Sequence, residues 1–423
     1  MNTSTGTGTR FGHRGAMSFA AHLPNGRRMR STRRAAGAVA MLTAICVATA
    51  LAPAAQAADR TGVSPIGLPV VAGEFAVTEV SHTGQWVGAR GGWLKEATHL
   101  ILDRSTGSRT ERAGDWNYGA ESGLVRDNPA LFLEITPSAI YVFAGAWLVN
   151  TTTGARTRID AGADGVPLAP SWQGTCDEEC GLVDYPGVQV APESVSRDGR
   201  LVAFCANYAE RTTFDLYLKD TVSGQLTQRP GLCGAGGPAQ MRHEYFQVEA
   251  PEISNDGRVV HVRGARDSEE GYFFKDSLLF TGSGSVRTIN GQGSMTRDGG
   301  LVFMRIGTYA PGTKDRTGGK VGAYNVRTKK TKVLPGRYRI YGTDAPSAFS
   351  AHDLASMRGR YVAYGDRLKV IDRQTGRTRN VRTLMLKDGF TPPSLSSWRP
   401  LLSGDGKVLV TTSGDQYVAV TLR

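Results

Sequence analysis

Short apolar runs separated by tight polar turns recur along the chain from about residue 75 to the C-terminus. Most copies contain Ser or Thr, then Asp-Gly, then four residues rich in Val and Leu. Asp bonds readily to its own backbone and Gly adopts positive φ, so each copy predicts a strand, a tight turn and a second strand. We count seven copies: SHTGQWVGA (81–89), TPSAIYVFA (136–144), SRDGRLVAF (196–204), SNDGRVVHV (254–262), TRDGGLVFM (296–304), SMRGRYVAY (356–364) and SGDGKVLVT (403–411).

A second pattern follows most of these copies at a short distance. It consists of an apolar strand, a polar turn usually centred on Thr-Gly or Ser-Gly, and a polar strand rich in Thr and Arg. Together the two patterns predict a four-stranded meander whose fourth strand is the most exposed. The copies are 100–113, 147–160, 216–229, 278–289, 322–334 and 368–381.

Repeated four-stranded units predict the architecture. One meander cannot bury both of its faces, so each must stack on its neighbours, and a spacing of about 54 residues between turns is typical of propeller blades with long loops. We predict an all-β fold, a single β-propeller over residues 74–423 with seven four-stranded blades; six blades is the alternative. The C-terminal DQYVAVTLR should pair with a strand from near GLPVVAGEFAVTEV (67–80), so that both chain ends close one blade. Arg, Lys and Thr on the outermost strands are expected to form a solvated edge rather than a polyanion site.

The first 57 residues have a different composition. They contain seven basic and no acidic side chains, followed by an Ala-rich apolar run and Ala55-Gln56-Ala57, the order typical of a secretory signal peptide. We therefore predict a signal peptide over 1–57, with Met29 as an alternative start, and a short segment over 58–73. Thr32-Arg33-Arg34 also permits the twin-arginine route, but no Phe-Leu pair follows, so Sec export is favoured.

Removing that segment changes the charge of the chain. The formal net charge falls from +12 to +5, so most of the basicity belongs to targeting and nucleic-acid binding is not expected. The apolar run is short and Ala-rich for a membrane span. We expect a secreted or envelope-associated monomer with no stable membrane span after cleavage.

The repeats resemble a known family. PEISNDGRVVHV and ESVSRDGRLVAF, each followed by a strand and Asp-x-x-Thr-Gly, are similar to the repeats of TolB-like, or WD40-like, β-propellers. The resemblance covers roughly residues 75–423 and implies the fold more than the function, because the matching residues are turn formers and core strands. The separate N-terminal domain of TolB has no counterpart here, and no hydrolase domain follows. Some TolB-like propellers are oligogalacturonate lyases with clustered histidines around a metal.

Catalytic motifs are missing from the sequence. No nucleophile elbow, zinc-binding helix, phosphate loop or dinucleotide-binding loop occurs. Five histidines beyond the signal are scattered, and His261, in an apolar strand, is predicted to be a satisfied core residue. Glu193 and Glu252 begin innermost strands, where they could form a carboxylate pair, although hydrogen-bonded carboxylates at the channel mouth are the favoured interpretation. We expect no catalytic residue, no metal and no cofactor.

Four cysteines lie beyond the signal. An exported chain meets an oxidising environment, so all four should form disulfides, and three connectivities are open. Strand order favours Cys176 with Cys180 and Cys205 with Cys233.

Long loops with aromatic residues are predicted to leave the propeller on one face, after strands two and four of each blade. Binding residues concentrate on such loops. We expect a ligand-binding surface formed by Trp172, His243, Tyr245, Phe246 and His352. The favoured function is a non-catalytic scaffold for an extracellular protein or glycan; the alternatives are a carbohydrate-active lyase or hydrolase and a structural envelope component.

Overall fold

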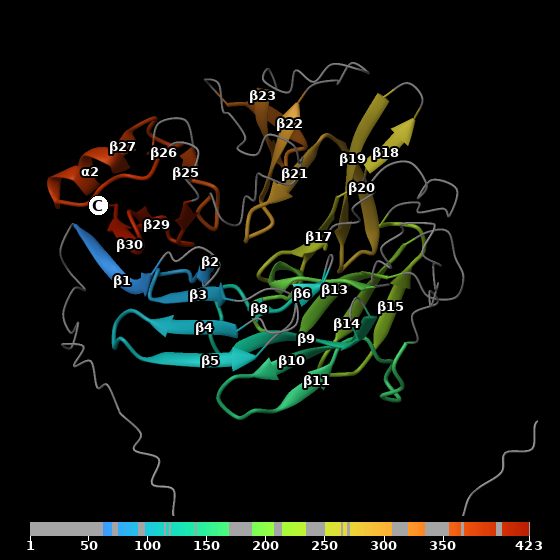
Figure 1. Cartoon of the computed structure of the whole chain (residues 1–423). Coiled ribbons are helices and arrows are strands. Elements are labelled where there is room, and N and C mark those ends of the chain that lie inside the picture. Colours follow the sequence, from blue (N-terminus) through green and yellow to red (C-terminus); the bar gives the residue numbers. More distant parts are fainter. Residues whose placement is uncertain are drawn as a thin grey trace, which may run out of the picture. The chain divides into compact units, whose positions relative to one another are not determined.

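The computed structural model describes fifteen stretches of the chain, all within one compact unit. They are residues 62–69, 75–91, 98–113, 116–117, 120–139, 142–168, 188–206, 214–233, 250–263, 265–268, 271–306, 320–334, 355–364, 368–394 and 400–422. Seven of the eight antiparallel sheets in the described residues are blades, arranged around the ring in chain order (Figure 1), and they form the seven-bladed β-propeller that the sequence predicts.

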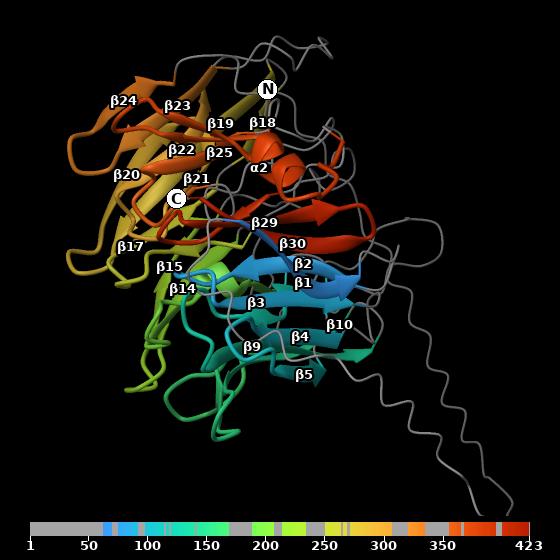
Figure 2. The same ribbon diagram turned by 90° about the vertical axis from the view of Figure 1, so that its left-hand side faces the viewer.

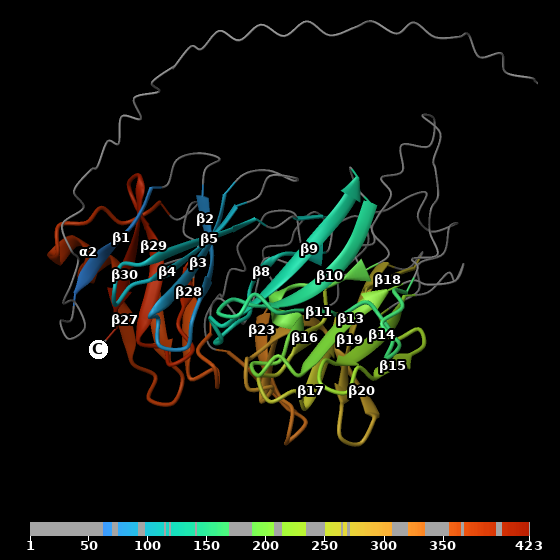
Figure 3. The ribbon, with the colours of Figure 1, turned by 90° about the horizontal axis from the view of Figure 1, so that it is seen from below.

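The first three blades are built from consecutive strands, with the first strand innermost. Blade 1 contains β2 (Phe75–Val80), β3 (Trp86–Gly91), β4 (Thr98–Asp103) and β5 (Arg109–Ala113). A small hairpin, β6 (Trp116–Asn117) with β7 (Ala120–Glu121), precedes blade 2, which contains β8 (Gly123–Leu124), β9 (Leu131–Ala139), β10 (Val142–Asn150) and β11 (Arg156–Arg158). In Figure 3 the long strands β9 and β10 extend beyond β8 and β11. Blade 3 contains β12 (Val188–Gln189), β13 (Leu201–Ala206), β14 (Asp215–Asp220) and β15 (Leu226–Arg229).

The next three blades carry small departures from the repeat. Blade 4 contains β16 (Glu252–Ile253), β17 (Val259–Val262), β19 (Gly271–Phe280) and β20 (Ser285–Asn290), and an extra strand, β18 (Ala265–Ser268), pairs with the start of β19. Blade 5 contains β21 (Gln292–Met295), β22 (Leu301–Ile306), β23 (Lys320–Asn325) and β24 (Lys330–Val333). In blade 6 a single bridge at Ala355 takes the innermost place beside β25 (Tyr361–Tyr364), β26 (Lys369–Asp372) and β27 (Thr378–Asn380). Helix α2 (Val381–Lys387), which the repeat pattern does not predict, follows β27.

Both ends of the propeller meet in blade 7, as predicted. The blade contains β28 (Leu401–Leu402), β29 (Val408–Ser413) and β30 (Gln416–Thr421), and its outermost strand is the N-terminal β1 (Val63–Pro69). Val63 pairs with Val420 and Pro65 with Val418. Figures 1 and 2 show β1 beside β30, so strands from opposite ends of the sequence close the ring.

The hydrophobic core lies between the blades rather than within them. Seven buried apolar clusters occur in the described residues, and each joins one blade to the next. The cluster that closes the ring contains Ile66 and Leu68 of β1, Val87 and Leu100 of blade 1, and Val410 of blade 7. Because each sheet buries its faces against two neighbours, no blade has a core of its own.

The Ser or Thr and the Asp of the repeated turn phrase are both explained by hydrogen bonds that their side chains make within the turn. The Ser254 hydroxyl donates to Asp256 Oδ1 at 2.7 Å and accepts from the Val259 N–H at 3.0 Å. Asp256 Oδ1 also accepts from the Arg258 N–H at 3.1 Å, and Gly257 has a φ of 71°. The same pattern recurs at residues 196–201, 296–301 and 403–408, so the phrase is a hydrogen-bonded turn that sets the start of the second strand.

One of the seven predicted turns is wrong. Residues 136–144 lie in β9, in β10 and between them, so they join the second and third strands of blade 2. The true inner turn of that blade is Val125–Asn128, which lacks Gly and instead has Asp127 at a φ of 60°. The sequence pattern did not identify this turn, because Asp127 adopts the left-handed conformation that Gly usually takes. Blade number is unaffected.

Among the described residues, no helix has the length and apolar character needed to cross a membrane.

Candidate functional site

The tight inner turns of successive blades are joined directly by backbone hydrogen bonds. The Arg197 N–H donates to the Asn255 carbonyl at 3.1 Å, and the Asn255 N–H donates to the Arg297 carbonyl at 2.6 Å. The chain of contacts continues through Asp298 to Met357, Met357 to Gly404 and Asp405 to His82. These contacts link the inner turns of blades 3, 4, 5, 6, 7 and 1 into a ring. The ring lies at the end of the propeller where the tight turns are.

A buried ion pair lies inside this ring. Arg297 of blade 5 reaches Asp127 of blade 2, with Nη1 2.5 Å from Oδ1, and its Nη2 donates to the Val80 carbonyl of blade 1 at 3.1 Å. The Asn255 amide of blade 4 donates to the other oxygen of Asp127 at 2.9 Å. Arg297 is 2% exposed and Asp127 7%.

This ion pair spans the propeller from one blade to another three positions away. Two full charges are stable in such a place only when each is paired and hydrogen-bonded, and both conditions are met here. The pair and its hydrogen bonds therefore occupy the middle of the propeller at the end that carries the tight turns.

Glu252, one of the two predicted channel carboxylates, is engaged inside the protein. It is 1% exposed, and its oxygens accept from the Arg263 guanidinium at 2.6 Å, the Ser294 hydroxyl at 2.6 Å and the Met295 N–H at 2.6 Å. Ser294 and Met295 belong to blade 5, so Glu252 ties blade 4 to its neighbour. A carboxylate with this set of donors is a structural group.

His261 is a satisfied core residue, as predicted. Its Nδ1 lies 2.9 Å from Glu252 Oε2 and its Nε2 lies 2.9 Å from Asp276 Oδ2. Burial alone lowers the pKa of His261, but the hydrogen bonds and charges of Asp276 and Glu252 outweigh burial and raise the pKa to about 10. The imidazole is therefore charged at neutral pH and donates to both carboxylates.

Glu193, the other predicted carboxylate, lies in the short 3-10 helix η2 (Pro192–Ser194) after β12. Its Oε2 is 3.7 Å from Nη2 of Arg126, the residue before Asp127 in the inner turn of blade 2. Glu193 and Glu252 thus have separate basic partners, and the geometry does not support a catalytic carboxylate pair.

His99 is buried without a partner for one ring nitrogen. It is 4% exposed, its Nε2 has no hydrogen bond, and its ring meets the Phe132 ring edge-on with centroids 5.2 Å apart. Burial, with a contribution from the Arg90 charge, lowers the pKa of His99 to about 4. The neutral ring acts as an apolar spacer between blades 1 and 2.

The predicted disulfide between Cys205 and Cys233 is confirmed. Cys205 lies in β13, Cys233 follows β15, and their Cα atoms are 5.9 Å apart. Cys176 and Cys180 lie outside the described residues, so their pairing stays a prediction.

The predicted ligand-binding residues also lie outside the described part of the chain. They are Trp172, His243, Tyr245, Phe246 and His352. Within the described stretches, no group of three or more His, Cys, Asp or Glu side chains is arranged to hold a metal ion. The axial pair of Asp127 and Arg297 was missed by the sequence patterns, since Arg297 occupies the variable second position of its turn phrase and the turn at Asp127 lacks the phrase.

Comparisons with known proteins assign no function to this chain. No protein-family model and no curated protein sequence matches the chain. Similar solved structures include the β-propeller domain of the Trilobed protease from Pyrococcus furiosus (10% identity, 83% of this chain and 95% of that chain, TM-score 0.46). They also include an oligogalacturonate lyase in complex with manganese (13% identity, 88% of this chain and 96% of that chain, TM-score 0.47). A third is TolB from Acinetobacter baumannii (13% identity, 79% of this chain and 78% of that chain, TM-score 0.35).

Proposed function

We propose that this chain is an exported, non-catalytic binding propeller that holds a protein or glycan partner on the face formed by its long loops. The observation that supports this proposal is that, at the opposite end, the buried Asp127–Arg297 pair and the hydrogen bonds between turns occupy the middle of the propeller. Loops on a rigid scaffold are where binding residues concentrate, and aromatic side chains next to polar groups suit both glycans and protein hot spots.

The proposal is tested by substitution on the two faces. Trp172→Ala and Tyr245→Ala change the predicted binding face, whereas Val222→Ser changes an exposed apolar residue in the β14–β15 turn, on the tight-turn face. Wild type and variants are screened on a glycan array and used to capture proteins from culture supernatant and cell-wall extract.

We expect one glycan class or one extracellular protein to bind the wild type and Val222→Ser equally. Binding should fall at least about tenfold in Trp172→Ala or Tyr245→Ala, as for a hot-spot residue, with the melting temperature unchanged. Equal binding by all variants would contradict the assigned face, and loss of folding in the aromatic variants would show that these residues are core.

A further inference from the structure

A cavity of about 220 Å³ lies between blades 6 and 7, at the end of the propeller that carries the tight turns. Its walls include Arg360 and Tyr361 at the start of β25, Asp372 at the end of β26, and Arg377 and Arg379 in and after the β26–β27 turn. Leu422, just beyond β30, contributes an apolar wall from blade 7.

The strand register explains why these side chains share one wall. Tyr361 pairs with Asp372, and Val370 pairs with Arg379. Alternate residues of a strand point to the same face, so Tyr361, Asp372, Val370 and Arg379 all lie on the face of blade 6 that looks toward blade 7. Deeper between the two blades, the same face packs Val370 against the apolar cluster of blade 7.

Three guanidinium groups line this cavity, and among the described residues only that of Arg360 has an acidic partner. Arg360 binds Asp372 through two contacts of 3.2 and 2.9 Å. Arg379 has its Nη1 buried with no hydrogen-bond partner, and no side-chain contact of Arg377 is found among the described residues.

Outer-strand arginines of other blades behave differently. Arg109 donates to the Gly67 carbonyl of blade 7 at 2.8 Å, Arg112 to the Thr151 carbonyl of blade 2 at 2.8 Å, and Arg287 to the Val326 carbonyl of blade 5 at 2.5 Å. These three side chains fasten neighbouring blades together. No such contact to a neighbouring blade is found for Arg377 or Arg379 among the described residues.

We propose that this cavity binds an oxyanion, a phosphate, sulfate or carboxylate group, held by Arg377 and Arg379 beside the fixed Arg360. A buried guanidinium N–H without an acceptor is costly, and an oxyanion supplies the charge and the acceptor oxygens together. Tyr361 and Leu422 offer apolar contact for the part of the ligand that carries the charged group. The site is separate from the proposed binding face and does not depend on it.

The test is calorimetric titration of the full chain with sodium sulfate, sodium phosphate and sodium acetate, at constant ionic strength maintained with sodium chloride. We expect saturable binding of at least one of these anions. Preference for sulfate and phosphate would identify a tetrahedral group, and preference for acetate a carboxylate. The double variant Arg377→Gln/Arg379→Gln should weaken binding at least about tenfold, because it removes two charge-assisted donors.

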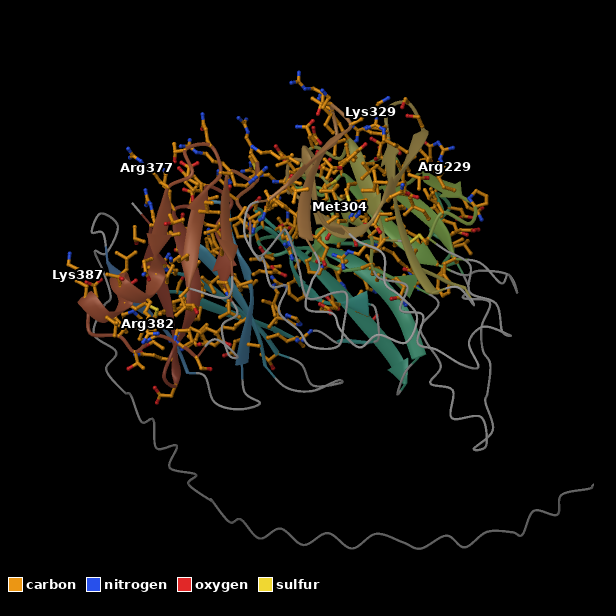
Figure 4. The ribbon with its side chains drawn as sticks, turned by 90° about the horizontal axis from the view of Figure 1, so that it is seen from above. Arg229, Met304, Lys329, Arg377, Arg382 and Lys387 are labelled. Carbon is orange, nitrogen blue, oxygen red and sulfur yellow. A yellow bond between two sulfur atoms is a disulfide. The ribbon has the colours of Figure 1, made fainter. Side chains whose placement is uncertain are left out.

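Two further variants separate this site from general attraction of anions to a basic surface. Arg382→Gln/Lys387→Gln removes the same charge from helix α2, where Figure 4 shows both side chains apart from Arg377, and should bind as the wild type does. Asp372→Asn removes the competing carboxylate and should tighten binding. Absence of saturable binding by the wild type, or equal weakening in both double variants, would overturn the proposal.

Discussion

Asp127 and Arg297 place two opposite charges inside the propeller, where each depends on the other. Removing one partner leaves an uncompensated buried charge, so we expect Asp127→Asn to lower the free energy of unfolding by about 3 to 5 kcal/mol. Asn tolerates the left-handed backbone at this position, which has a φ of 60°, so the loss reports on charge. Urea unfolding followed by circular dichroism measures it.

Two comparisons control this prediction. Asp164→Asn removes a carboxylate from an exposed turn and should change the free energy of unfolding by less than about 0.5 kcal/mol. Combining Asp127→Asn with Arg297→Met should cost less than the sum of the two single changes, because the double variant has no unpaired charge. Equal stability of Asp127→Asn and Asp164→Asn would show that the axial pair contributes nothing.

The charged state of His261 gives the protein a pH dependence in the alkaline range. The folded pKa of about 10 exceeds the usual value of 6.5, so the folded state binds the proton more tightly than the unfolded state. The resulting stability is fully present below pH 6.5 and is lost as pH rises toward 10. We expect the free energy of unfolding to decrease across this window, and His261→Gln to remove most of that slope while lowering stability at neutral pH. An unchanged slope in the variant would assign the dependence to other groups.

The strands and turns that sequence patterns identify well are those whose conformation depends on neighbours in the chain. Ser254, Asp256 and Gly257 complete their turn within six residues, and so the phrase could be recognised from its letters. The turn at Asp127 makes its contacts with Asn255 and Arg297, which are distant in the sequence, and the pattern missed this turn. Helix α2 was not predicted for a related reason. Its buried residues, Val381 and Met385, pack against blade 7, and this contact cannot be recognised from neighbouring positions in the sequence.

The disulfide of blade 3 joins strand β13 to the segment that follows β15, within the core between blades 3 and 4. Cys205 and Cys233 are 28 residues apart, and closing a loop of this length in the unfolded chain is worth about 3 to 4 kcal/mol in the chain-entropy model. We expect Cys205→Ala/Cys233→Ala to lose about that much unfolding free energy in denaturant titrations under oxidising conditions.

Reduction provides the matched control for this loss. In strong reductant the wild type and the double alanine variant should have similar stability, because both then lack every disulfide, including the predicted Cys176–Cys180 bridge. Both cysteines are buried, at 0% and 2% exposure, so part of the variant's loss comes from packing and persists in reductant. A wild type that keeps its full stability after verified reduction would contradict the entropic contribution.

At the scale of the whole propeller, sequence repeats predicted the blade number because each blade needs the same turn and the same apolar strands to stack on the next. The closing strand was placed approximately: β1 begins at Val63, four residues before the predicted stretch, because Pro65 and the glycines around it obscure an alternating pattern. The candidate binding face could be inferred only from loop length and aromatic content. The anion cavity could not be predicted at all, because it depends on Arg379 lacking the contact to a neighbouring blade that Arg109, Arg112 and Arg287 make.

Closure by β1 makes the ends of the chain interdependent. A chain that begins at Gly73 lacks β1 and leaves the N–H and C=O groups of β30 unpaired along an exposed edge, while Ile66 and Leu68 no longer fill the cluster between blades 7 and 1. Burial of two such side chains is worth about 3 to 6 kcal/mol, and unpaired edges recruit other strands.

Compared with a chain that begins at Gly62 and keeps β1, the shorter chain should unfold at a lower urea concentration and form concentration-dependent oligomers in analytical ultracentrifugation. Adding a peptide of residues 62–69 should restore the monomer by replacing the missing strand; a shorter chain that is already monomeric and equally stable would show that blade 7 does not need β1.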